Sequence, residues 1–227
     1  ESVSISNTTE MINKIVINDF QSIINDLEKE HPKITCFINI DEYVLLDLIR
    51  QEDIYKVFSA RKKLEKNYCC NATIYNVDLN ETSKTVMKSI SREIYLISQL
   101  NHPSLIKLIG FSVKDYENRP RPITITEKIP YQTLYDLIKT EQNNIHIKEW
   151  NDTKKLINIF GIASGMKYLH SQNIIHRNLS SGRIFLDHNS YPKISSFDYI
   201  QNIYEHQYSE PNEIFCETRY ISPEVIK

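Results

Sequence analysis

The chain has 227 residues, of which 41% are hydrophobic and 25% are charged, and its formal net charge is −2. This composition is typical of a folded globular protein that is long enough to bury a core, and it includes no basic stretch that would favour a nucleic-acid partner. No apolar run approaches the ~20 residues of a membrane-spanning helix, and the first residues lack the pattern of a secretory signal. We therefore expect no nucleic-acid partner and no membrane partner.

Cysteine, histidine and glycine each limit the chemistry. Cys69 and Cys70 are adjacent, and in a strand they would point to opposite faces, so we expect reduced thiols in a cytoplasmic protein rather than a mutual disulfide. None of the seven histidines has the spacing of metal ligands, so no metal site is predicted. The four glycines all lie at or beyond Gly110, which excludes a glycine-rich phosphate-binding loop from the first 109 residues.

The first expected element is an accessory helix within residues 1–33. Asn7 and Glu10 have the spacing of a capping box, and Pro32 marks the end of the helix. Packing against a neighbouring sheet is one interpretation of this helix, and binding of a partner protein is the other. The apolar residues that follow at helical spacing are Ile12, Val16, Phe20, Ile23, Ile24 and Leu27.

Residues 34–128 have the pattern of a mostly antiparallel sheet with one helix. The helix is expected over residues 83–100, with Glu93 beside its apolar face. β-Branched and aromatic residues dominate the remaining segments. They predict strands at residues 34–40, 42–49, 54–62, 69–79, 104–113 and 122–129.

Beyond residue 128 the pattern becomes helical. A short helix is expected over residues 133–142 and a long one over residues 150–172, followed by two short strands at residues 183–187 and 192–196. The long helix carries apolar residues that we expect to form a buried stripe. These are Leu156, Ile159, Phe160, Ala163 and Met166.

Several motifs follow one another in a fixed order along residues 42–227. SREIYLISQLNHPSLIKLIGF, which begins at Ser91, is followed by YLHSQNIIHRNLSSGRIFL, YPKISSFD and RYISPE. In this order they resemble the αC helix, the catalytic loop, the metal-binding segment and the end of the activation segment of eukaryotic protein kinases, and they are most similar to the tyrosine-kinase-like group. The resemblance implies an α+β, bilobal fold: an N-lobe of antiparallel sheet and αC helix over residues 34–128, and an incomplete helical C-lobe over residues 129–227.

The resemblance also identifies positions that lack the family's phosphate chemistry. The glycine-rich loop, which lets backbone N–H groups approach the nucleotide phosphates, matches a segment with Arg50, Glu52 and Tyr55 at the glycine positions. Side chains there crowd the phosphates, and the carboxylate of Glu52 repels them. The strand lysine that pairs with the α/β-phosphates matches Ile74, which carries no charge.

The catalytic and metal-binding positions are substituted as well. The aspartate that accepts the proton of the substrate hydroxyl matches Asn178, whose amide cannot act as that base. The catalytic-loop lysine matches Ser180, and the metal-binding asparagine matches Arg183. The metal-binding aspartate matches Ser196, and Asp198 stands at the glycine that follows it. We therefore predict no functional catalytic residue, no metal and no ATP or magnesium cofactor.

The positions that build the fold match the family better than the phosphate-binding and catalytic positions do. The side chains that hold the lobes in register match Ile97, Leu108, His176 and Phe197, and we interpret His176 as a packing residue that hydrogen-bonds to the backbone rather than as a general base. The apolar walls that enclose adenine are also matched. They predict a vestigial adenine pocket formed by Val57, Ala72, Thr126 and Phe185, with Glu93 in the cleft.

Glu93 lacks the lysine that pairs with it in the family. A carboxylate in a closed cleft needs a compensating partner or access to water. Three outcomes are open: the helix swings outward, Glu93 finds another cation, or Glu93 binds a proton. We hypothesise that Arg183 pairs inside the cleft with Glu93 or with Asp198.

The sequence is interpreted as a catalytically inactive kinase-like domain, a pseudokinase that acts as a scaffold or allosteric partner in signalling, for example of an active kinase. The main alternative is a serine/threonine kinase with residual ATP binding or weak phosphotransfer. An interaction module that works through residues 1–30, and a truncated, non-functional kinase fragment, are two others. The chain ends three residues after SPE, without the family's later helices, so we expect an exposed apolar patch on the helix at residues 150–172.

Overall fold

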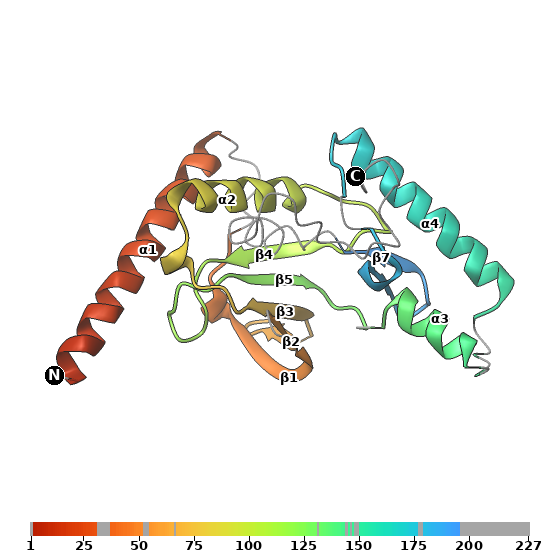
Figure 1. The fold of residues 1–227 in the computed structure, drawn as a ribbon, viewed down its shortest axis with the longest axis horizontal. Helices are drawn as coiled ribbons and strands as arrows, with labels where there is room; N and C mark the ends of the chain where they lie inside the picture. Colours follow the sequence, from red (N-terminus) through yellow and green to blue (C-terminus); the bar gives the residue numbers. More distant parts are fainter. Residues whose placement is uncertain are drawn as a thin grey trace, which may run out of the picture. The chain divides into compact units, whose positions relative to one another are not determined.

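The computed structural model describes most of the chain, as two compact units shown in Figure 1. The first unit comprises Glu1–Leu100 and Lys107–Lys128, and the second comprises Asn101–Ile106 and Ile129–Lys227. The units meet in the sequence at residue 128, where the pattern changes from strands to helices. The described residues are 2–30, 37–51, 55–65, 67–130, 132–143, 145, 147, 150–176 and 179–195.

A five-stranded sheet forms the centre of the first unit. Its strand order is β1-β2-β3-β5-β4, and every neighbouring pair is antiparallel. The predicted antiparallel sheet is therefore confirmed. The strands are β1 (Tyr43–Gln51), β2 (Tyr55–Lys62), β3 (Cys69–Tyr75), β4 (Leu108–Ser112) and β5 (Ile123–Glu127).

The expectation of a strand at residues 34–40 is not met in the described part of that segment, while residues 34–36 lie outside the description. The described part begins at Phe37, which forms one isolated bridge to Phe111. A 3-10 turn, η1 (Ile40–Glu42), then bends the chain, and the side chain of Asn39 caps it. The turn ends this pairing after one bridge, so a β-rich composition is not sufficient for a strand here.

Helix α1 (Ser2–Glu30) begins earlier than the sequence predicts and ends where it predicts. Asn7 lies inside the helix, so the expected capping box is wrong. No proline or glycine precedes Asn7, so nothing in that stretch stops the helix from extending to Ser2. The end at Glu30 comes shortly before Pro32, which disfavours helical backbone at the residue that precedes it.

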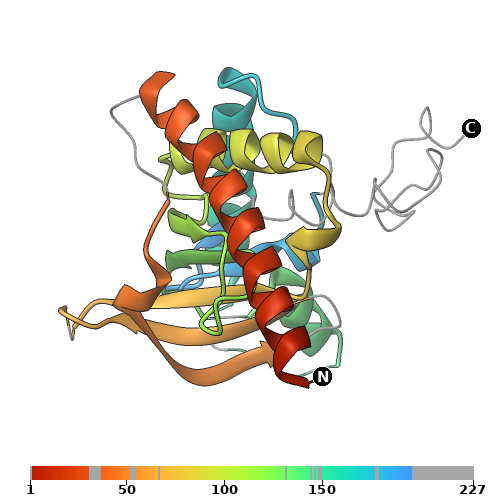
Figure 2. The ribbon, with the colours of Figure 1, turned by 90° about the vertical axis from the view of Figure 1, so that its left-hand side faces the viewer.

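One side of α1, which carries Asn13 and Phe20, packs against the rest of the first unit. Phe20 is fully buried, and the centroid of its ring lies 6.2 Å from that of Phe111 on β4. The side-chain amide of Asn80 donates a hydrogen bond of 2.9 Å to Asn13. α1 also contacts α2 (Lys84–Ser98), which it crosses in Figure 2. The helix thus packs on its own unit, as one of the two interpretations predicts.

The first half of α1 presents apolar side chains to solvent. Met11, Ile12 and Ile15 are 64%, 47% and 54% exposed. Ile12 is one of the residues predicted to pack, and this prediction is wrong. The packed side of the helix runs through Asn13 and Phe20 instead.

The second unit has helices of the expected type. A capping box begins α3 (Leu134–Gln142): Thr133 Oγ1 accepts from the backbone N–H of Asp136, and the carboxylate of Asp136 accepts from the N–H of Thr133. Asn151 caps α4 (Asp152–Ser171). Two short antiparallel strands follow, β6 (Ile184–Leu186) and β7 (Pro192–Ile194).

The apolar stripe predicted for α4 is exposed rather than buried. Leu156, Ile159 and Phe160 are 67%, 65% and 74% exposed. The buried residues of α4 are instead Asn158, Gly165 and Leu169, and the strand β7 approaches the helix closely at Gly161 and Gly165. The expectation of a buried stripe is therefore wrong, whereas the expected apolar patch on this helix is present.

Gly165 gives a test of this close approach. A Cβ at Gly165 would lie 2.8 Å from Ile194 Cδ1, closer than side-chain atoms normally come. An alanine in a helix usually stabilises by about 1 kcal/mol relative to glycine. Here we expect Gly165→Ala to lower the free energy of unfolding by about 1–3 kcal/mol, as overpacking does, when measured by urea denaturation.

Gly182→Ala is the matched control. The nearest atom to a Cβ at Gly182 is Ser180 Oγ at 3.8 Å, so the same substitution meets no obstruction. We expect a change within about 0.5 kcal/mol, the usual range for surface substitutions. Equal effects of the two variants would contradict the packing described for α4 and β7.

Candidate functional site

The predicted nucleotide-binding positions of the first unit lie on three neighbouring strands. Val57 of β2 is opposite Thr73 of β3, while Thr126 and Thr124 of β5 are opposite Asn71 and Thr73. Residues directly opposite one another in antiparallel strands share a face of the sheet. These five residues therefore lie on one face, which we call the Val57 face.

Ala72 and Ile74 lie on the other face of the sheet, the Ala72 face. Ala72 is opposite Ile125, and both are fully buried members of the apolar core of this unit. Ile74 is opposite Lys56 of β2 and packs against that core. The expectation that Ala72 shares a pocket wall with Val57 is therefore wrong, because the register places the two residues on opposite sides of the sheet.

Asn71 and Thr73 are the residues that the sequence pattern missed. They lie two residues apart on the Val57 face. The resemblance assigned positions with this same spacing to Ala72 and Ile74. Both side chains are buried, with exposures of 0% and 8%. A signal was present in the sequence, since asparagine is depleted in strands and its presence in β3 indicates a special environment.

Two cations of the described strands lie on the Val57 face, Arg50 of β1 and Arg61 of β2, and neither belongs to β3. β3 contains no lysine or arginine at any position, so no choice of register supplies the family's strand cation. Lys56 of β2 belongs to the Ala72 face. Arg50 of β1 is opposite Val57 and half-buried, and it is therefore a cation on the face where the family binds phosphate.

Tyr55, one of the residues at the expected glycine positions, packs against an aromatic neighbour. Its ring centroid lies 6.3 Å from that of Tyr75, which is directly opposite it in the β2–β3 register. The side chain thus adds bulk to the strand end where a flexible loop was required. Glu52 lies outside the described residues.

His176 in the second unit is placed as the sequence predicts. It is 5% exposed, and its Nε2 lies 2.8 Å from the carbonyl oxygen of Ser195. Since a carbonyl can only accept, this nitrogen carries the proton and donates it. The interpretation of His176 as a packing residue bonded to backbone is therefore confirmed.

Phe185 and Arg183 also belong to the second unit. Phe185 packs with Ile106 and Ile129 in a small apolar cluster. Arg183 closes the 3-10 turn η3 (Ser181–Arg183), which Ser180 precedes, and its backbone carbonyl accepts a hydrogen bond from the N–H of Ser195.

Several predicted residues lie outside the described part of the structure. Of the side chains predicted to hold the lobes in register, Ile97 and Leu108 are described, and both are buried in the first unit. The side chain of Glu93 on α2 is not described, so its pairing with Arg183 stays a hypothesis. Like Glu52, four other predicted residues lie outside the described part: Asn178, Ser196, Phe197 and Asp198.

No three His, Cys, Asp or Glu side chains among the described residues are arranged to hold a metal ion. Of the helices that the structure describes, none combines the length and the apolar character that a membrane crossing requires.

The adjacent cysteines of β3 differ sharply in environment. Cys69 is exposed and Cys70 is fully buried, and both are free thiols, as expected for neighbours on opposite faces. Burial, with a smaller contribution from Cys69, raises the pKa of the Cys70 thiol to about 11. Cys70 is therefore protonated and unreactive at neutral pH in the folded protein.

Comparison with known proteins gives one family match. A family model described as protein tyrosine and serine/threonine kinase matches residues 51–227. The chain is 33% identical to cysteine-rich receptor-like protein kinase 10 of Oryza sativa subsp. japonica over 151 residues, which are 64% of this chain and 22% of that protein.

Two other relatives extend this pattern. Cysteine-rich receptor-like protein kinase 24 of Arabidopsis thaliana is 34% identical over 131 residues, 55% of this chain and 19% of that protein. Tyrosine-protein kinase receptor svh-2 of Caenorhabditis elegans is 29% identical over 175 residues, 76% of this chain and 15% of that protein. The chain thus spans about a fifth of the length of the curated relatives it matches.

The two thiols of β3 make a testable contrast. We expect iodoacetamide at pH 8 to alkylate Cys69 rapidly, while Cys70 reacts only on unfolding. The raised pKa also disfavours the thiolate in the folded state, so this group's contribution to stability falls as pH rises from about 8.5, the unfolded pKa, towards 11.

Single-cysteine variants measure both effects. Mass spectrometry of the alkylated protein should show that Cys69→Ala loses the fast label of β3 and that Cys70→Ala keeps it. Urea denaturation between pH 8 and pH 11 should show a shallower loss of stability in Cys70→Ala than in Cys69→Ala. Fast labelling at Cys70 in the folded protein would contradict its buried position.

Proposed function

The chain belongs to the protein tyrosine and serine/threonine kinase family, and from this premise we propose that it is a catalytically inactive member that works by binding a signalling protein. One observation carries the proposal: β3, the strand that should present the phosphate-binding lysine, contains no lysine or arginine at any position. Without that cation the α/β-phosphates have no charged partner on this strand.

The other substitutions support the same proposal. A general base alone contributes typically ~10²–10⁴-fold to a rate, and the position of that base holds Asn178. Ser196 replaces a metal-binding carboxylate, and Arg183 puts positive charge where magnesium would bind. Because the metal ions neutralise charge that develops on the transferred phosphoryl group, their loss affects the same step as the missing base. The residues present do not fit a magnesium nucleotide, and we derive no phosphoryl transfer through one.

A role in protein binding is supported by what the chain keeps. The sheet of the first unit has a closed apolar core in which Ile40, Ala60, Ile123 and Ile125 are fully buried. A folded unit without the family's chemistry still presents specific surfaces to a partner. We propose a partner within signalling, an active kinase being one example, and a cytoplasmic location.

A second function, residual nucleotide binding, is favoured by a specific residue. Arg50 is opposite Val57 in the β1–β2 register and places a guanidinium group on the Val57 face. Arginine binds phosphate in a bidentate manner. A nucleotide held by Arg50 would need no metal, which separates this alternative from ordinary kinase chemistry.

Thermal unfolding with ligands tests the proposal. We expect no change in the unfolding midpoint of the purified chain with ATP or adenosine at 1 mM, with or without Mg²⁺, because a ligand raises the midpoint only if it binds the folded state. A cooperative transition verifies that the protein is folded. A midpoint that rises with ATP and rises further with Mg²⁺ would contradict the proposal and reopen phosphotransfer.

The residual-binding alternative gives a different result in the same assay. A rise with ATP that Mg²⁺ does not change, and that Arg50→Gln abolishes, would establish it in place of an empty fold. Lys63→Gln, which removes an exposed cation at the far end of β2, is the control and should leave any rise unchanged.

The two faces of β3 give a sharper test. The starting variant carries both Asn178→Asp and Ser196→Asp. In this variant, either Thr73 or Ile74 is then replaced by lysine. We expect only Thr73→Lys to produce an ATP-dependent rise of the midpoint above that variant's own ligand-free value, because Thr73 shares a face with Val57 and Ile74 does not. A rise with Ile74→Lys alone would contradict the register.

A further inference from the structure

A pocket of about 570 Å³ opens on the first unit, with its floor on the Ala72 face. Its floor is formed by half-buried residues of the Ala72 face, Leu45 of β1, Phe58 of β2 and Ile74 of β3. Leu45 and Phe58 belong to that face because Leu45 is opposite Ala60, and Phe58 is opposite Ala72. Tyr55 and Tyr75, which also line the pocket, are opposite each other two positions along from Val57 and Thr73, so the pocket extends to the Val57 face at this end of β2 and β3.

Aromatic rings line much of the pocket. Tyr55 and Tyr75 contribute the tilted pair described above, and Tyr116 of the β4–β5 loop packs against the core from the opposite wall. The hydroxyl of Tyr116 is buried, and burial raises its pKa well above the ordinary value. Tyr116 thus stays neutral and serves as an apolar wall.

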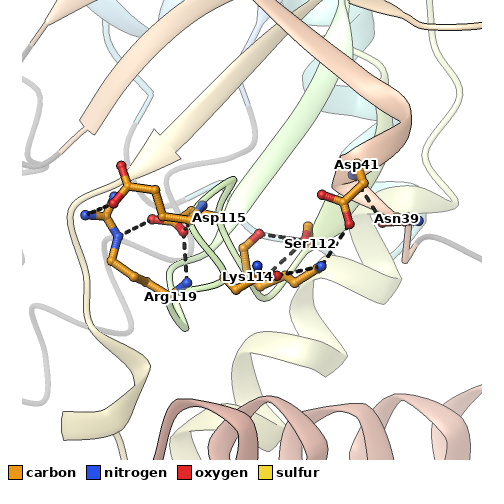
Figure 3. A network of polar contacts seen from close by, with 8 residues as sticks. Asn39, Asp41, Ser112, Lys114, Asp115 and Arg119 are labelled. Carbon is orange, nitrogen blue, oxygen red and sulfur yellow. Dashed lines mark hydrogen bonds and ion pairs between the residues drawn. The ribbon is translucent and has the colours of Figure 1, made fainter. Parts of the chain in front are cut away.

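Polar contacts connect residues within the β4–β5 loop, which forms one side of the pocket, as Figure 3 shows. The carboxylate of Asp115, which is 2% exposed, accepts hydrogen bonds of 2.9 Å from the backbone N–H groups of Glu117 and Arg119. It also accepts one of 2.7 Å from Arg119 Nε, and Arg119 lies 2.8 Å from the carboxylate of Glu117. The wall is therefore formed before any ligand arrives.

A second set of contacts ties this loop to the start of β1. Lys114 Nζ donates to Asp41 at 2.9 Å and to Asn118 at 2.9 Å, as Figure 3 also shows for Asp41. Asp41 belongs to η1, whose neighbour Tyr43 begins the strand that carries Leu45. The wall and the floor of the pocket are thus connected by an ion pair.

The charges that line the pocket do not balance. Both of its carboxylates, Asp115 and Glu117, are paired with Arg119. Its two other cations, Lys56 and Arg121, form no ion pair or side-chain hydrogen bond with any described residue. Lys56 is opposite Ile74, and the residue after Arg121 accepts a hydrogen bond from the N–H of Tyr75. The two unpaired cations therefore flank Ile74 and Tyr75.

We propose that this pocket binds a small aromatic anion. The ring lies against Phe58, Ile74 and Tyr75, and the acidic group lies between Lys56 and Arg121. The volume is within the range of roughly 300–1,000 Å³ that small-molecule sites occupy, and the lining combines apolar and aromatic side chains with polar and charged ones. Two exposed polar side chains at the rim, Gln51 and Asn76, offer further hydrogen bonds. The site does not depend on the function proposed above.

Isothermal titration calorimetry of the full chain tests the site with three probes. Naphthalene-2-sulfonate provides the ring and the charge, naphthalene-2-sulfonamide provides the ring alone, and sulfate provides the charge alone. We expect saturable 1:1 binding of the sulfonate, binding of the sulfonamide at least ~10-fold weaker, and no saturation with sulfate, because two charge-assisted contacts each contribute about a factor of ten. Absence of saturable sulfonate binding up to 5 mM overturns the proposal.

Variants place the binding in this pocket. Arg121→Gln and Lys56→Gln should each weaken sulfonate binding about 5–10-fold, as loss of one charge-assisted contact implies. Asn76→Trp, at an exposed position, should fill the pocket and abolish binding. Lys63→Gln removes an exposed cation outside the pocket and should change nothing. Sulfonate binding that survives both Arg121→Gln and Asn76→Trp, in variants that unfold cooperatively, would place the ligand elsewhere and overturn the proposal.

Discussion

The antiparallel register that joins β2, β3 and β5 determines which side chains can meet a ligand and which must form the core. Side chains alternate between the two faces of a strand, so a shift of one residue exchanges the entire set. Val57 opposite Thr73 fixes one face, and Ala72 opposite Ile125 fixes the other. The Val57 face is lined by hydroxyl and amide groups, and the Ala72 face combines the apolar core with the pocket beyond it.

The sequence predicts the elements of this chain well and their register poorly. β-Branched runs, the proline after α1 and the capping residue Thr133 each act within a few residues of their own position, so composition reveals them. Register depends on which residues of distant strands meet, and composition does not contain that information. Matching β3 to a family motif by its single alanine therefore selected Ala72 and Ile74, whereas the pairing with β5 selects Asn71 and Thr73.

The long helix α4 shows the same limit in another form. An apolar stripe predicts a helix correctly, because it has helical spacing, but it does not say what will cover the stripe. In α4 the described contacts run through Gly161 and Gly165, where the absence of a side chain lets β7 come close, and Leu156 and Phe160 face solvent. His176 was predictable because its role, a hydrogen bond to backbone, requires only its position in a well-defined loop.

The attachment of α1 has a mechanical consequence. A helix of 29 residues is about 43 Å long, and its contacts with the rest of the unit include Phe20 against Phe111 and Asn13 with Asn80. Phe111 lies on β4, an edge strand of the sheet, so a force applied to the exposed turns around Met11 and Ile15 reaches the sheet at its rim. Tension on α1 would therefore separate β4 from the sheet first, then β5 and β3, and the β1–β2 pair at the opposite edge would bear load last.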